Sequence, residues 1–220
     1  MSAGEIAGAV ALGVFAYLLG AVPFGVWIGR ATRGIDIREH GSGNTGTTNA
    51  YRVLGTRAGT VVLICDVAKG AVPALLAGLL YPAWLAVILA ALPVVGHVKS
   101  VFLRGGGGKG TATGAGVVLG LMWLVFLMVL AAFLFTLVTT RMVSAASITA
   151  AVAFPLITWV TGQPLPYLIV ALVLGSLVIL AHHGNIARIV RGREPRVRFP
   201  WNRREAGERP ADEGRTQAPP

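Results

Sequence analysis

Three short segments hold most of the polar side chains that could do chemistry in this 220-residue chain. The first reads GSGNTGTTN over residues 41–49 and is followed by Arg52. Glycines in this number let backbone N–H groups approach an anion, and short hydroxyl and amide side chains can add hydrogen bonds. Arg52 could clamp a phosphate through its two-pronged guanidinium group. The alternative, a glycine-rich loop with a helix cap, explains one or two of these residues and not nine in succession.

The second segment is a glycine run that ends in a lysine, reading RGGGGKGT over residues 104–111. We expect a helix to begin at Thr111, which would place Lys109 at the positive end of a helix, where anions bind. The segment is not a Walker A motif, because Leu103 and Gly110 stand where that motif needs Gly and Ser or Thr. ATP hydrolysis is therefore not expected. The alternative is a flexible basic loop at the membrane surface.

The third segment reads HHGNIAR over residues 182–188. His182 and Asn185 are three residues apart and would share one face of a helix. His182 is the natural candidate for a general base, whereas capping of helix carbonyls is the competing interpretation. His183 would point elsewhere, and we interpret it as a boundary residue without a chemical role.

The composition places these segments in a membrane protein. Hydrophobic residues make up 55% of the chain and charged residues 13%, about half the ~25% charged share of a soluble domain. This composition excludes intrinsic disorder and a soluble multidomain enzyme. The net charge is +10, but nine of the 19 Lys and Arg residues lie between Arg188 and Arg215. That clustering fits enrichment on the cytoplasmic side of a membrane, and we expect no nucleic-acid partner.

We expect an all-α, polytopic integral membrane protein with about seven short transmembrane helices. As a single helix, the uncharged stretch 111–140 would measure roughly 45 Å, longer than the ~30 Å hydrocarbon core, so we divide it near Gly120. The seven expected spans are 6–29, 59–80, 83–98, 111–120, 121–140, 142–160 and 165–182. Basic loops then lie in the cytoplasm and the N-terminus outside. Five spans with re-entrant pieces are the alternative.

The predicted transmembrane domain covers residues 1–194, and residues 195–220 are expected to form a basic, disordered cytoplasmic tail. Asp66 and Lys69 lie within a predicted span, three residues apart. Because charges in a membrane are costly, we interpret them as a pair that supports the site, with substrate contact as the alternative. The single cysteine, Cys65, excludes an internal disulfide. The carboxylates lack metal-site spacing, so no metal is expected.

Together the three segments resemble the PlsY family, the acyl-phosphate:glycerol-3-phosphate acyltransferases of bacterial membranes. The family motifs read roughly GSGNxGATNxxRxxG, GHxFPVFLxFxGGKGVAT and HxxNIxRLLxGxE. The chain has GSGNTGTTNAYRVLG at 41–55, GHVKSVFLRGGGGKGTAT at 96–113 and HHGNIARIVRGRE at 182–194. The departures, among them Thr47 where the family usually has Ala, leave the family's Ser, Arg, Lys, His and Asn unchanged.

The resemblance implies transfer of a fatty acyl group from acyl phosphate to the sn-1 hydroxyl of glycerol 3-phosphate. The products are lysophosphatidate, for phospholipid biosynthesis, and phosphate. The expected location is the bacterial cell membrane, multi-pass, with the active site facing the cytoplasm. The implied catalytic residues are Ser42, Arg52, Lys109, His182 and Asn185. The implied substrate-binding residues are Gly41, Gly43, Asn44, Thr48, Asn49, Gly107, Gly108, Gly110 and Ser144. Either His182 or a substrate phosphate could take the hydroxyl proton.

Two other functional classes are alternatives to this hypothesis. A transporter for a phosphorylated solute would use the same anion-binding loops, but polar residues would line several spans from side to side, and only Asp66 and Lys69 are deep. A membrane scaffold with a lipid-binding tail leaves the three segments unexplained. Acyltransferases with an H-x4-D motif are not matched, since no His has Asp five residues later.

Overall fold

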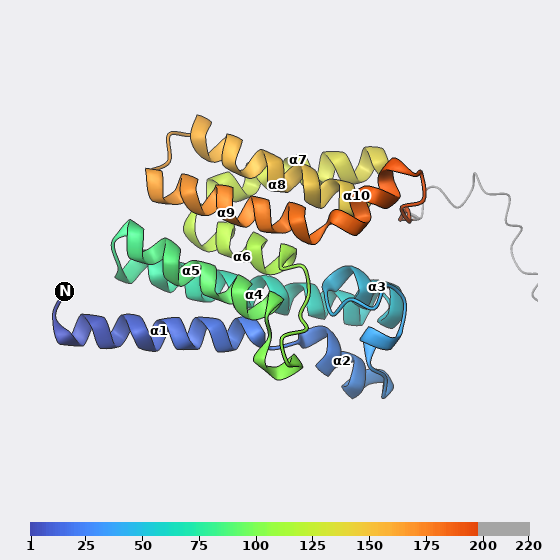
Figure 1. Ribbon diagram of the computed structural model, residues 1–220, viewed down its shortest axis with the longest axis horizontal. Coiled ribbons are helices and arrows are strands. Elements are labelled where there is room, and N and C mark those ends of the chain that lie inside the picture. The colour runs from blue at the N-terminus through green and yellow to red at the C-terminus, as the bar shows by residue number, and fades with distance from the viewer. Residues whose placement is uncertain (198–220) are drawn as a thin grey trace, which may run out of the picture.

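The computed structural model describes residues 1–197, and the regular elements in that range are all helices (Figure 1). In chain order they are α1 (Ala3–Ala21), α2 (Phe24–Arg33), η1 (Ile37–Glu39), α3 (Thr47–Leu54), α4 (Thr56–Leu80), α5 (Ala83–Val98), η2 (Val101–Leu103), α6 (Thr111–Leu121), α7 (Trp123–Thr140), α8 (Val143–Val160), α9 (Leu165–Ala181) and α10 (His183–Val190). The predicted all-α membrane fold is confirmed. The predicted tail, apart from residues 195–197, lies outside the described residues.

Five segments are long and apolar enough to cross a membrane: α1, α4, α5 with its η2 extension, α7 and α8. A sixth forms when α9 is taken together with α10, which bends away from it by 59°. The apolar helix α6 has 11 residues, or roughly 17 Å of length, which is short of the ~30 Å hydrocarbon core. The predicted polytopic architecture therefore holds, and the count of seven spans is approximate.

Two breaks in long apolar stretches shape the chain. The stretch 111–140 breaks at Met122, between α6 and α7, close to the predicted division near Gly120. The predicted single span 6–29 is wrong, because α1 ends at Ala21 and α2 begins at Phe24. Pro23 stands at this break, where it lacks the N–H that a continuous helix would need.

Helices α4, α5 and α6 lie between α1 on one side and α7, α8 and α9 on the other (Figure 1). Close packing of α4 against α6 depends on glycine. A Cβ atom on Gly70 would lie 2.1 Å from the Thr113 carbonyl oxygen, and one on Gly116 would lie 2.0 Å from the Val67 carbonyl oxygen. Small residues of this kind let helix backbones approach in membranes. The start of α6, and with it the loop that carries Lys109, is thereby fixed against α4.

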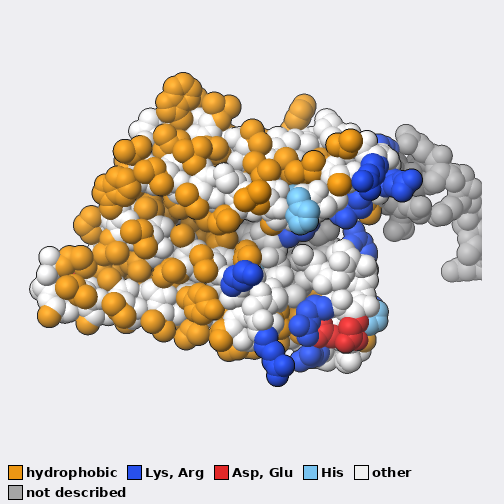
Figure 2. All heavy atoms as spheres, viewed as in Figure 1, with side chains coloured by type: hydrophobic (Ala, Val, Ile, Leu, Met, Phe, Trp, Pro, Cys, Tyr) orange, Lys and Arg blue, Asp and Glu red, His pale blue; other side chains and the backbone are white. Residues whose placement is uncertain are grey.

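Charged side chains gather at one end of the molecule. Figure 2 shows hydrophobic side chains over the end that carries the N-terminus, and Lys, Arg, Asp and Glu side chains at the opposite end. That opposite end is formed by α2, α3 and α10 (Figure 1). The three polar segments of the sequence therefore meet at the same end of the fold.

Candidate active site

The loop before α3 folds around the side chain of Asn49, which is 1% exposed. Its Nδ2 donates to the carbonyl oxygens of Ile37 at 2.8 Å, Asn44 at 2.9 Å and His40 at 3.1 Å, and its Oδ1 accepts from the Ser42 N–H at 2.8 Å. These bonds use both donors of the amide. The structure thus gives Asn49 a part in shaping the loop, and its predicted contact with substrate stays a prediction.

This folding leaves the neighbouring polar groups facing outward. Gly41 and Gly43 have φ values of +62° and +71°, in the left-handed region that favours glycine. Asn44 Oδ1 accepts from the Gly46 N–H at 2.8 Å, immediately before α3 begins. The Arg52 side chain makes no hydrogen bond or ion pair with any other residue in the range 1–197. The exposed residues of this segment are Gly41, Ser42, Gly43, Thr48 and Arg52.

The second loop packs against the end of α5 through its glycines. The Gly108 N–H donates to the His97 carbonyl oxygen at 3.1 Å. A Cβ atom on Gly107 would lie 1.9 Å from that oxygen, and one on Gly108 would lie 2.3 Å from His97 Nε2. The contact with α5 therefore already requires glycine at both positions, in addition to the predicted approach to an anion. Gly110, with φ +75°, turns the chain into α6.

Lys109 links the second segment to the third. Its Nζ donates to Asn185 Oδ1, while Asn185 Nδ2 donates to Glu194 Oε1 at 2.6 Å. An ammonium group can only donate and a carboxylate can only accept, so these two partners fix the orientation of the amide. Burial lowers the pKa of Lys109, and the negative charge of Glu194 acts in the opposite direction.

Glu194 is a residue that sequence reasoning did not place in the site, although it closes the third motif. Its Oε2 accepts from Arg188 Nε at 2.7 Å. Burial alone would raise the pKa of Glu194, but the neighbouring polar groups of Ser144, Asn185 and Arg188 outweigh it and lower the pKa. Ser144, at the start of α8, is buried and neighbours Glu194. The predicted contact of Ser144 with substrate stays a prediction.

His182 lies at the bend between α9 and α10 and is buried. Its Nδ1 lies 2.8 Å from the Val178 carbonyl oxygen. Because a carbonyl can only accept, Nδ1 carries the hydrogen, and Nε2 of the neutral ring can accept a proton. His183 places its Nδ1 3.0 Å from the Leu180 carbonyl oxygen and is exposed. Burial distinguishes the two histidines, whereas both contact helix carbonyls, so the role of His182 as a base stays a prediction.

The second and third segments are in direct contact through Lys109 and Asn185. The first segment approaches the second at Gly108, where a Cβ atom would lie 3.0 Å from Thr45 Oγ1. Among the described residues, no group of three or more His, Cys, Asp or Glu side chains could hold a metal ion. The catalytic roles of the individual residues stay predictions.

Glu194→Gln is expected to destabilise the protein by about 1–3 kcal/mol at pH 7, because the carboxylate holds Asn185 and Arg188. The pKa of Glu194 in the folded protein lies below its ordinary value of 4.5. Its ionised form therefore contributes stability above about pH 4.5, and that stability is lost as the pH falls through the folded pKa. Thermal unfolding in detergent should show a large difference from wild type at pH 7 and a smaller one below pH 4.5. An equal difference at both pH values would contradict this account; the exposed Glu39→Gln is the control.

Fold and site together define a class: a helical membrane protein with a basic, glycine-rich polar site at one end. Residues 10–192 match the family described as glycerol-3-phosphate acyltransferase. The enzyme of that name from Synechococcus sp. (strain JA-2-3B'a(2-13)) is 47% identical over 185 residues, which are 84% of this chain and 92% of that protein. The one from Geobacillus kaustophilus is 42% identical over 190 residues, which are 86% of this chain and 96% of that protein.

Two solved structures indicate the same family as these relatives. The crystal structure of PlsY, an integral membrane glycerol 3-phosphate acyltransferase, in its glycerol 3-phosphate form matches with a TM-score of 0.84 and 40% identity, covering 87% of this chain and 96% of that one. The lysophosphatidic acid form of PlsY matches with a TM-score of 0.82 and 39% identity. This chain therefore belongs to the PlsY family of glycerol-3-phosphate acyltransferases, as its three motifs predicted.

Proposed function

We propose that this chain transfers a fatty acyl group from acyl phosphate to the sn-1 hydroxyl of glycerol 3-phosphate, forming lysophosphatidate and phosphate. The observation that carries the proposal is the contact of Lys109, at the end of the glycine loop, with Asn185, three residues after His182. The acceptor and product fit the PlsY structures in glycerol 3-phosphate and lysophosphatidic acid forms. Two basic, glycine-rich loops suit two phosphate-bearing substrates.

The chemistry of the donor explains why these residues suffice. The hydroxyl oxygen of glycerol 3-phosphate bonds to the acyl carbon, and the bond from that carbon to the phosphate oxygen breaks, with its electron pair leaving on phosphate. The ammonium of Lys109 would stabilise that charge. The hydroxyl proton goes to His182 Nε2 or to a phosphate oxygen of bound substrate, whose second pKa is near 6. The mixed anhydride is already activated, so the step requires neither metal nor cofactor.

The direct test uses the purified protein in detergent with EDTA present. Acyl phosphate and glycerol 3-phosphate should together yield phosphate and lysophosphatidate in equal amounts, with no phosphate release when the acceptor is left out. NMR of the product distinguishes an sn-1 ester from an sn-2 ester. Product formation from an acyl thioester but not from acyl phosphate would overturn the proposed donor. Cys65→Ser should remain fully active, because the thiol lies within α4 and outside the three segments.

We expect direct transfer without an acyl-enzyme intermediate. Ser42 is the hydroxyl residue of the first loop, and the hydrogen bonds of residues 1–197 do not join its Oγ to a histidine that could activate it. In a single turnover with labelled acyl phosphate and no acceptor, the protein should carry no covalent label. A label on Ser42 that glycerol 3-phosphate then discharges would make Ser42 the nucleophile.

The active site should face the cytoplasm. Lys and Arg side chains lie at the end formed by α2, α3 and α10 (Figures 1 and 2), whereas the turns at 81–82 and 161–164 carry none. In a Cys65→Ser background, Gln163→Cys should react with a membrane-impermeant reagent added outside intact cells, and Arg57→Cys should react only after the membrane is opened. The reverse pattern would invert the orientation.

A further inference from the structure

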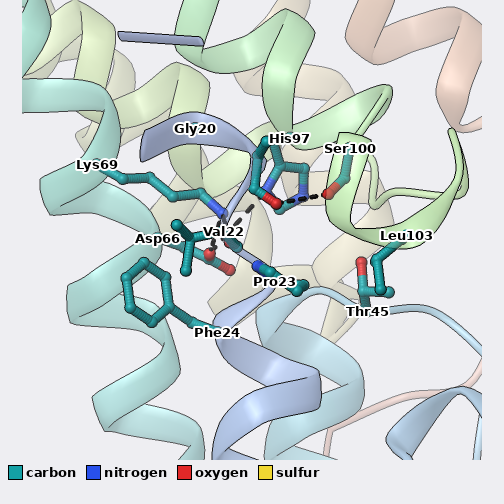
Figure 3. A pocket seen from close by; sticks show the side chains of 11 residues that line it. Gly20, Val22, Pro23, Phe24, Thr45, Asp66, Lys69, His97, Ser100 and Leu103 are labelled. Atoms are coloured by element: carbon teal, nitrogen blue, oxygen red, sulfur yellow. Dashed lines mark hydrogen bonds and ion pairs between the residues drawn. The ribbon is translucent and has the colours of Figure 1, made fainter. Parts of the chain in front are cut away.

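A buried polar cluster lies beneath the two glycine-rich loops (Figure 3). Lys69 Nζ and Asp66 Oδ1, both from α4, are 2.7 Å apart, and the two side chains are 1% and 2% exposed. His97 of α5 places its Nδ1 3.9 Å from the same Asp66 oxygen and 3.2 Å from Thr113 Oγ1 of α6. Burial of charged side chains in a membrane protein is costly even when they are paired. The cluster is therefore expected to have a structural or functional role.

One role of the cluster is to bond to the backbone at the break between α1 and α2. The break takes the carbonyl groups of Ala21 and Val22 out of the helical pattern. Lys69 Nζ donates to the Val22 oxygen at 2.9 Å, and Ser100 Oγ donates to the Ala21 oxygen at 2.6 Å. A cavity of about 10 Å³ lies among these groups, also lined by Phe24, which is room for about one water molecule. Lys69 therefore ties the break to α4, and unsatisfied carbonyls are avoided.

The cluster also reaches the first loop. Thr47 Oγ1 donates to Asp66 Oδ2 at 3.3 Å. Thr47 is the first residue of α3 and belongs to the same segment, 41–49, as Ser42. Since the family motif usually has Ala at this position, the hydrogen bond is a feature that distinguishes this chain from the motif. Asp66 thus forms an ion pair with Lys69 through one oxygen and accepts a hydrogen bond from Thr47 with the other.

The second loop is reached through His97. Its carbonyl oxygen accepts from the Gly108 N–H at 3.1 Å, and its ring meets Thr113 in the first turn of α6. Lys109 follows Gly108 directly. The two loops also approach each other above the cluster, because Thr45 Oγ1 would lie 3.0 Å from a Cβ atom on Gly108.

We propose that Asp66, Lys69 and His97 form a positioning cluster that holds both anion loops in one relative arrangement. Asp66, fixed by Lys69, positions the first loop through Thr47, and His97 positions the second loop through Gly108 and Thr113. None of the three need touch a substrate. Because both loops contact the same buried groups, loss of one of these hydrogen bonds is expected to weaken the binding of both substrates. The inference rests on the proposed function, in which the loops bind acyl phosphate and glycerol 3-phosphate.

The test removes single hydroxyl groups and leaves the buried ion pair intact. Thr47→Val and Thr113→Val keep the side-chain shape and delete the hydrogen bonds to Asp66 and His97. Each variant should raise the KM for acyl phosphate and the KM for glycerol 3-phosphate about 3- to 10-fold. Thr158→Val is the matched control, because Thr158 is also buried and its hydroxyl donates at 2.8 Å to the Phe154 carbonyl oxygen within α8. Its KM values should equal those of wild type.

The outcomes separate positioning from stability. If each variant raises the KM of one substrate only, the loops are not coupled and the proposal is wrong. If the active fraction falls while both KM values stay at the wild-type level, the cluster is merely structural and the proposal is also wrong. Failure of the proposed donor would appear as a wild-type enzyme inactive with acyl phosphate. In that case, direct binding of labelled glycerol 3-phosphate still decides, since both variants should weaken it and Thr158→Val should not.

Discussion

Lys109→Ala is expected to lower kcat/KM for acyl transfer roughly 30- to 1000-fold. Loss of a charge-assisted contact in a partly buried site costs about 2–4 kcal/mol. The Lys109 ammonium donates one N–H to Asn185 Oδ1. Its other N–H groups can donate to a phosphate oxygen. The Asn185 amide should stay in place in the variant, because Glu194 still holds its Nδ2. Initial rates measured against each substrate give the change.

Lys99→Ala is the matched control for this prediction. Lys99 is an exposed lysine at the end of α5, before the same glycine loop, and its removal should leave kcat/KM near the wild-type value. Lys109→Arg should also be poor, because a planar guanidinium does not replace a compact ammonium beside Gly108 and Gly110. Wild-type kinetics in Lys109→Ala would remove this residue from the site.

Sequence patterns could predict the helices whose ends coincide with changes in polarity. The predicted span 83–98 has the same bounds as α5 (Ala83–Val98), because Pro82 and Lys99 flank a run without Lys, Arg, Asp or Glu. The break at Met122 could be anticipated from helix length alone. The break at Pro23 could not, since proline in an apolar stretch is equally compatible with a kinked span. What stabilises it is tertiary: hydrogen bonds from Lys69 and Ser100, distant in the sequence.

Of the site, too, the sequence could predict one part and not another. Spacing predicted that His182 and Asn185 share one face of a helix, and in the structure His182 lies at the bend just before α10, which carries Asn185. The Lys/Arg pattern predicted that the three segments lie on one side of the membrane. Spacing could not show that Lys109 reaches Asn185, which is 76 residues away. Residue type could not show that the Asn49 amide bonds to the backbone of its own loop.

His182→Gln is expected to lower kcat about 10²- to 10⁴-fold, the usual contribution of a general base, with little change in KM. The Nδ1–H of His182 donates to the Val178 carbonyl oxygen, so the ring is oriented with Nε2 unbonded among residues 1–197. Glutamine keeps a polar side chain of similar reach but accepts no proton at neutral pH. His183→Gln is the matched control, since His183 is adjacent, exposed and makes the same type of contact with Leu180. It should behave as wild type.

The pH dependence of kcat then identifies the group that takes the proton. If His182 Nε2 takes it, the acidic limb of the wild-type profile belongs to His182 and disappears in His182→Gln. If a substrate phosphate takes it, the limb persists near pH 6, because the second phosphate pKa is unchanged by the substitution, and kcat falls by less than about tenfold. A variant with full kcat would leave His182 as a cap on the end of α9. The proton would then move between the two substrates, and the protein's part would be to hold them in the loops of Ser42 and Lys109.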